Sequence, residues 1–209
     1  MTFRSEARGA RVLHFDCECR PMAWYGGDFV TKQPTAVAWK FADWAPKQQP
    51  SVMWIGASHE PDNLADEETE MIETFREAWY EADIVTGHFI RGFDLPLLDG
   101  ALMRLDLPLL GEKLTSDTKL DFAKAQGISK SQENLGEMFE LEHPKVPMGT
   151  AKWFESNQLT TKGLTYTIER VVGDVLQHID LRTEMLARGL LAEPKVWSPT
   201  ASGVGVYTA

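Results

Sequence analysis

Apolar and polar residues follow strand-like patterns along the first quarter of the chain. The run 11–16 is mainly apolar and ends at Asp16, and 35–41 alternates between apolar and polar residues. The turn-like sequence APKQQP then leads into a third apolar segment, 51–56. These spacings predict an antiparallel meander with a hairpin between the second and third strands.

Further along the chain, apolar residues recur at helical spacing, with short apolar runs between the helices. Ser131 is expected to cap the N-terminus of one helix, and Gly189 is expected to end the last one. The elements predicted after the meander are a helix over 67–81, a strand over 82–88, a helix over 94–105, a strand over 114–118, and helices over 119–126, 131–141 and 163–189.

This order of elements predicts one mixed α/β domain over 11–190. A short extension, 1–10, precedes it, and a tail that is expected to be extended or disordered, 191–209, follows it. The chain has 209 residues, of which 43% are hydrophobic and 25% charged, which fits one globular domain.

The sequence also bears on the cellular location of the protein. No apolar run approaches the ~20 residues that a membrane-spanning helix needs, so no membrane association is expected. The N-terminal residues lack the apolar core of a secretory signal. Cys17 and Cys19 lie too close along one strand for an easy disulfide, which favours a reducing, cytoplasmic location.

The formal net charge is −10. This charge argues against a protein that simply coats a nucleic-acid duplex, because phosphate binding relies on clustered Lys and Arg. It does not exclude an enzyme that meets phosphate through bound cations.

Four carboxylates are the candidate metal-binding residues. Asp16 and Glu18 point to the same face at the end of the first strand, where like charges repel and desolvation is costly. Asp94 follows the fourth strand at the start of a helix, and Asp174 lies beside the apolar stripe of the last helix. Strand ends and helix edges can meet at one rim of a sheet. Two hard divalent cations, Mg²⁺ or Mn²⁺, would supply the missing counter-charge and could clamp a phosphodiester.

Each of these residues also has an ordinary structural interpretation. Asp16 and Glu18 could be surface charge, and Asp94 could cap its helix. Asp174 could be solvated, and Asp180 competes for its role. The two cysteines could form a soft-metal site, although a second pair is missing and packing behind the strand is the alternative.

Three stretches together resemble a known family. FDCECR resembles the D-x-E signature of the DEDD 3′–5′ exonucleases, which have the ribonuclease-H-like fold. IVTGHFIRGFDLPLL is similar to their second motif and to the proofreading domain of family B DNA polymerases, although His88-Phe89 stands where His-Asn or Tyr-Asn is usual. VVGDVLQHIDLRTEML is similar to the third motif. The resemblance covers about 11–188 and includes connecting segments like those of ribonuclease D relatives.

The resemblance implies both a fold and a site. The fold would be a ribonuclease-H-like mixed sheet, an antiparallel meander of three strands followed by parallel strands, flanked by helices. Asp16, Glu18, Asp94 and Asp174 would be the metal-binding carboxylates. The implied function is a metal-dependent 3′–5′ exonuclease that cuts phosphodiester bonds at the 3′ end of single-stranded or frayed DNA or RNA with two metal ions.

Such an enzyme would act alone, or as a proofreading or trimming partner of a polymerase or another replication or repair protein. A cellular and a phage origin both stay open. An endonuclease of the same fold is one alternative, and a catalytically silent nucleic-acid-binding or protein-binding module is another. Trp24 and Trp153, in predicted loops, are candidates for stacking on bases.

The residue that orients the attacking water is where the chain departs from the family. The family places a tyrosine four residues, or a histidine five residues, before the last aspartate, and this chain has Arg170 and Glu169 there. Glu169 could accept the proton of the water or add a metal ligand, and it is the favoured candidate. His178, one turn beyond Asp174, could act instead. The third explanation is that the metal ions act without a protein base.

Overall fold

The computed structural model describes residues 9–22, 31–124 and 127–199. Its centre is a six-stranded sheet in the order β3-β2-β1-β4-β5-β6. The neighbours β1, β2 and β3 pair antiparallel, β4 and β5 run parallel to β1, and β6 pairs antiparallel with β5. The strands are β1 (Val12–Pro21), β2 (Lys32–Phe41), β3 (Ser51–Trp54), β4 (Ile84–Gly87), β5 (Lys113–Asp117) and β6 (Lys195–Trp197).

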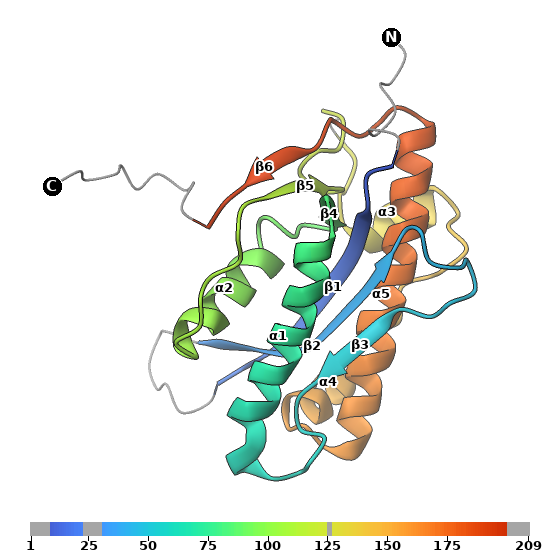
Figure 1. Cartoon of the computed structure of the whole chain (residues 1–209). Helices are drawn as coiled ribbons and strands as arrows, with labels where there is room; N and C mark the ends of the chain where they lie inside the picture. The colour runs from blue at the N-terminus through green and yellow to red at the C-terminus, as the bar shows by residue number, and fades with distance from the viewer. Residues whose placement is uncertain (1–8, 23–30, 125–126, 200–209) are drawn as a thin grey trace, which may run out of the picture.

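Helices flank this sheet (Figure 1). They are η1 (Pro61–Asn63), α1 (Leu64–Glu81), α2 (Asp94–Arg104), α3 (Gln132–Met138), α4 (Thr150–Asn157) and α5 (Thr161–Ala187). The long α5 packs on β1 and β2, and α3 and α4 pack against it. The predicted mixed α/β fold, with a meander followed by parallel strands, is therefore confirmed, and it is compatible with a ribonuclease-H-like fold. None of the helices in the described part of the chain combines the length and apolarity that crossing a bilayer requires.

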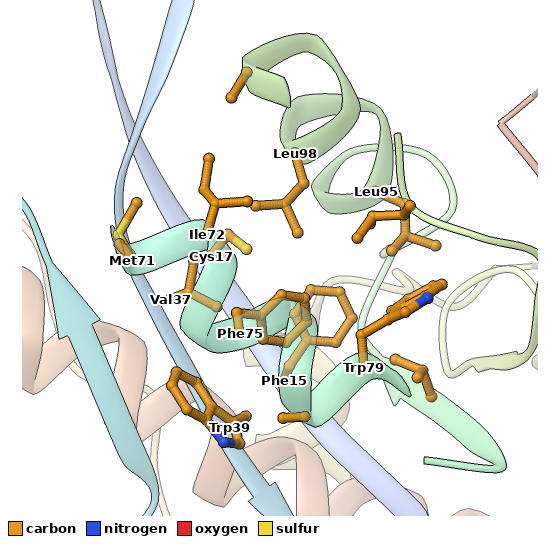
Figure 2. Packing of buried hydrophobic residues seen from close by; sticks show 14 of the residues in the cluster. Phe15, Cys17, Val37, Trp39, Met71, Ile72, Phe75, Trp79, Leu95 and Leu98 are labelled. Carbon is orange, nitrogen blue, oxygen red and sulfur yellow. The ribbon is translucent and has the colours of Figure 1, made fainter. Parts of the chain in front are cut away.

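The two faces of the sheet bury different kinds of side chain. Phe15 and Cys17 of β1 point into the main core, where they pack with Phe75 and Trp79 of α1 (Figure 2). On the face toward α5, β2 contributes the small residues Ala36 and Ala38, which pack with Val171 and Val175 of the helix. Because alanine projects so little, the helix can lie close to the sheet. Residue 174, adjacent to one of these valines, is thereby brought to the strands.

Two local predictions about helix ends are confirmed. The Ser131 hydroxyl accepts a hydrogen bond from the backbone N–H of Asn134 at 3.2 Å, so it caps α3. Gly189 follows α5 with a φ of 67°, a left-handed conformation that glycine adopts without strain. Its N–H donates to the carbonyl of Leu186, which closes the last turn of the helix.

The predicted helix over 119–126 is wrong for its described part. Asp117, at the end of β5, accepts hydrogen bonds from the backbone N–H groups of Lys119 and Leu120, and these bonds hold the chain in a turn. Phe122 then forms a bridge to Leu191, beyond the end of α5. Local propensity is overridden here by pairing with a distant segment.

Two further differences concern elements that the pattern did not indicate. Trp153, expected in a loop, lies in α4. Lys195–Trp197, inside the expected tail, adds β6 to the edge of the sheet. The remaining predictions for Trp24, for 1–8 of the N-terminal extension and for 200–209 of the tail fall outside the described residues.

Candidate metal centre

Strand β1 places two carboxylates beside the long helix. Asp16 pairs in register with Ala38, and Glu18 with Ala36, so both acids lie on the face that α5 covers. The register shifts just after Glu18, at a bulge. Alternation along the strand thus gives Asp16 and Glu18 one common direction, as the sequence predicts.

Helix α5 brings the third carboxylate. Asp174 is 3% exposed. One carboxylate oxygen from each of Asp16, Glu18 and Asp174 lies within 4.8 Å of the other two. The Oδ1 of Asp174 is buried and has no hydrogen-bond partner. A buried carboxylate oxygen without a donor is costly, so this atom is suited to a ligand that supplies positive charge.

Asp94 completes the set from the first turn of α2, and it is also 3% exposed. Its Oδ1 accepts a hydrogen bond from the backbone N–H of Cys17 at 3.1 Å, between the two acids of β1. The side chain does not cap its own helix, because Phe93 is the N-cap residue and no side-chain cap bond forms. Asp94 instead fixes the start of α2 to β1, at the edge of the cluster.

The electrostatics of the metal-free site are unfavourable for four charged acids. Burial, followed by the charges of Asp94, Asp174 and Glu18, raises the pKa of Asp16 well above its usual value. Burial and Asp174 raise the pKa of Glu18 to about 7, and burial is the largest cause that raises the pKa of Asp94 to about 7. The carboxylates therefore compete for protons in the absence of a cation.

The four acids line one cavity of ≈ 280 Å³. Two aromatic side chains, Phe89 and Phe93, form part of its wall. The Nζ of Lys119 lies 4.0 Å from the centre of the Phe89 ring, and that of Lys32 lies 4.5 Å from the Phe93 ring. The other lining residues are Cys17, His88, Ser131, Gln132 and Lys145. The cavity thus combines acidic, aromatic and basic groups.

Two cations of the chain sit among the acids. The Nζ of Lys145 lies 3.3 Å from Asp174 Oδ2 and 3.4 Å from Gln132 Oε1. The Nε of Arg170 lies 3.0 Å from Asp174 Oδ2 and 3.4 Å from Glu18 Oε1. The position of Arg170 was recognisable in the sequence only as a departure from the family. Lys145 lies in a segment without periodic pattern, so no sequence signal pointed to it.

A second residue that sequence reasoning missed is Asp117, which is fully buried. Its carboxylate accepts backbone hydrogen bonds from Phe89 and Arg91, in addition to those from the turn that follows β5. These bonds fix the loop between β4 and α2. Within this loop, Phe89 has a left-handed backbone conformation with a φ of 71°. The available signal was an aspartate at the end of a predicted strand.

The structure does not bring the favoured water-orienting residue, Glu169, into the site. Glu169 is exposed on α5 and does not line the cavity. His178 is 1% exposed, and its ring nitrogens lie within hydrogen-bonding distance of the hydroxyls of Thr86 and Thr118. Neither of these residues lines the cavity.

Of the remaining candidates, only Cys17 contributes to the lining of the cavity. Asp180 accepts hydrogen bonds from the backbone N–H and the Nδ1 of His143, so it has a partner outside the cavity. Cys17 packs in the core behind the strand, and Cys19 is half-buried. Trp153 is half-buried in α4 and does not line the cavity.

The donor set fits a hard divalent cation. All of the clustered ligands are carboxylate oxygens, which Mg²⁺ and Mn²⁺ prefer, and Asp174 Oδ1 has no hydrogen-bond partner in the protein. The residues that would hold the ion are Asp16, Glu18 and Asp174, with Asp94 beside them.

Comparisons with known proteins bear on the fold. No protein-family model and no curated protein sequence matches the chain. Among solved structures, the family B DNA polymerase from the hyperthermophilic archaeon Pyrobaculum calidifontis is similar, with a TM-score of 0.60 and 18% sequence identity. The match covers 85% of this chain and 24% of the polymerase chain. The protein therefore shares its mixed α/β fold with about a quarter of a family B DNA polymerase.

Proposed function

We propose that the protein is a metal-dependent nuclease that hydrolyses phosphodiester bonds at the 3′ end of single-stranded or frayed DNA or RNA. The observation that carries the proposal is the gathering of carboxylate oxygens from Asp16, Glu18 and Asp174 within 4.8 Å of one another. Asp94 lies on the same cavity. The order of these acids along the chain resembles that of the DEDD exonucleases, and the fold likeness to a DNA polymerase chain supports a nucleic-acid substrate.

The four acids have two kinds of role in the proposed site. Bound Mg²⁺ or Mn²⁺, expected from the resemblance as two ions, would supply activation of the attacking water and stabilisation of the leaving oxygen. Asp16, Glu18 and Asp174 supply the oxygen ligands from one strand and one helix. Asp94 is held in place by the backbone of β1 through the N–H of Cys17. The ligands therefore stand on rigid elements, which favours a fixed geometry.

The cavity supports a chain end as the substrate. Its volume of ≈ 280 Å³ is slightly below the range for small-ligand pockets, roughly 300–1,000 Å³. Phe89 and Phe93 offer rings on which terminal bases could stack. Few lysines and arginines line the cavity, so we expect few phosphate contacts and a shallow dependence of affinity on salt.

The placement of Glu169 and His178 favours the third explanation for the attacking water. One side chain is exposed on the helix and the other is enclosed among threonine hydroxyls. We therefore propose that no side chain among the described residues serves as a dedicated base, and that activation of the water would come from bound metal. Action beside a polymerase or another replication or repair protein remains part of the proposal.

A 5′-labelled single strand incubated with Mn²⁺ and resolved on a gel tests the proposal. We expect products shortened one nucleotide at a time from the 3′ end. Asp174→Asn should lower the rate at least ~100-fold, since even residues that only support a metal ligand cost 10–100-fold. Asp180→Asn, on the same helix but paired with His143, is the matched control and should cleave like the wild type.

Other outcomes select the alternatives. Cleavage of a circular single strand as fast as a linear one would indicate an endonuclease of the same fold. Metal or strand binding without any cleavage would indicate a silent binding module. Equal activity of Asp174→Asn and the wild type would show that the site lies elsewhere.

A further inference from the structure

A guanidinium occupies the space between two of the candidate ligands. Arg170 precedes Asp174 by one helical turn, and its Nε lies 3.0 Å from Asp174 Oδ2 and 3.4 Å from Glu18 Oε1. The side chains of Arg170 and Glu18 are each only 12% exposed, and that of Asp174 is 4% exposed. Arg170 therefore bridges an acid of the strand and an acid of the helix in a setting with little water.

The guanidinium is also held from its other side. Its Nη1 donates a hydrogen bond to the backbone carbonyl of Val146, which follows Lys145 in the segment lying over α5. Gly173 lets this segment approach, because a Cβ at that position would lie 2.5 Å from a methyl carbon of Val146. An arginine in a protein does not lose its proton, so this positive charge is permanent.

The charges of the site can be counted. Asp16, Glu18, Asp94 and Asp174 carry −4 when ionised, and the two basic residues in ion pairs with them, Arg170 and Lys145, carry +2, which leaves −2 for this ion-paired group. One divalent cation neutralises that remainder, whereas two would leave +2 in a region that is largely shielded from water. An uncompensated buried charge is costly, so the balance favours a single ion.

We propose that Arg170 takes the place of one of the two expected cations, and that the site binds one divalent ion. This inference rests on the proposed function, since it presupposes that the carboxylates bind metal. The remaining ion would use Asp16, Glu18 and the unpartnered Oδ1 of Asp174.

The number of bound Mn²⁺ ions tests this inference on the full chain without any activity measurement. Isothermal titration calorimetry, with electron paramagnetic resonance to count free Mn²⁺, should give one ion for the wild type. Arg170→Gln removes the charge, keeps a polar side chain and should raise the count to two. Arg188→Gln is the matched control, because Arg188, at the C-cap of α5, also forms an i,i+4 ion pair but lies on the surface, and this variant should still bind one ion.

The possible results are distinguishable. Two ions in the wild type would overturn this inference and leave the proposed nuclease intact. No bound ion in the wild type would contradict the proposed function itself. If circular dichroism shows that Arg170→Gln does not fold, Arg170→Lys replaces it. That variant keeps the charge and should bind one ion, and a count of two for it would also contradict the inference.

Discussion

At the scale of single residues, the site combines crowded carboxylates with basic side chains that form ion pairs with them. The common face of Asp16 and Glu18 could be predicted because strand side chains alternate with period two. The contacts of Arg170 and Lys145 with Asp174 could not, because ion pairs between distant segments depend on tertiary packing. Glu169 shows the same limit, since a matching position in a motif does not determine which way a helical side chain faces.

Asp16→Asn should separate the effect of the crowded carboxylates on stability from their effect on metal binding. Burial and the neighbouring acids raise the pKa of Asp16, so removing its charge should leave the metal-free protein as stable as the wild type or slightly more stable. Thermal melts in EDTA and in Mg²⁺ measure both effects. Mg²⁺ should raise the midpoint of the wild type more than that of Asp16→Asn. A variant that melts well below the wild type in EDTA would show that Asp16 is needed for the fold instead.

At the scale of elements, the regular strands and long helices were predictable and the connections were not. α1 and α5 carry long apolar stripes, and the meander carries short alternating runs, so their existence follows from the sequence. The segment after β5 fails as a helix because its backbone bonds to Asp117 and to residues beyond α5. β6 is only three residues long, and such a strand is set by the edge it joins.

The most important of these connections is held by Asp117. Its carboxylate accepts four backbone hydrogen bonds, from Phe89, Arg91, Lys119 and Leu120, which join the loop after β4 to the turn after β5. Asp117→Ala leaves these N–H groups without their acceptor and should lower the free energy of unfolding by about 3 kcal/mol or more. Urea denaturation measures this change.

Asp117→Asn provides the graded control, because an amide keeps one acceptor oxygen and should lose less stability. The same variants should bind Mn²⁺ about 10–100-fold more weakly, since the loop leads into Asp94 and would support the proposed metal site. A loss below about 0.5 kcal/mol for Asp117→Ala, which is typical of surface positions, would contradict this role.

At the scale of the whole molecule, the fold class followed from the order of strands and helices, while the site depended on three elements meeting. β1, α2 and α5 each bring carboxylates from segments that lie far apart in the chain. The small face formed by Ala36 and Ala38 allows this meeting, and it is visible in the sequence only after the position of α5 is known. The sequence thus indicates the candidate ligands, and the packing shows which basic side chains, Lys145 and Arg170, pair with them.

The stability of the metal-free protein should depend on pH, because these carboxylates lie close together in the folded state. The pKa of Glu18 and that of Asp94 are raised to about 7 in the folded protein, against about 4 when unfolded. An acid whose pKa is higher in the folded than in the unfolded state contributes to stability. This contribution is complete below the pKa of the unfolded state, and it is lost as the pH rises through the pKa of the folded state. His14 and His88, whose pKa burial lowers to about 4, act in the opposite direction, but only below about pH 6.5.

The informative window is therefore about pH 6.5 to 8.5. Thermal melts in EDTA should show the midpoint falling across this window, because the folded state loses protons that the unfolded state has already released. With saturating Mg²⁺ the fall should shrink or reverse, since deprotonated carboxylates bind the cation more tightly. Asp16→Asn should flatten the curve in EDTA, because it removes one of the acids whose pKa is raised in the folded protein. A midpoint in EDTA that is constant or rises from pH 6.5 to 8.5 would mean that the four acids do not share their charge as the structure indicates.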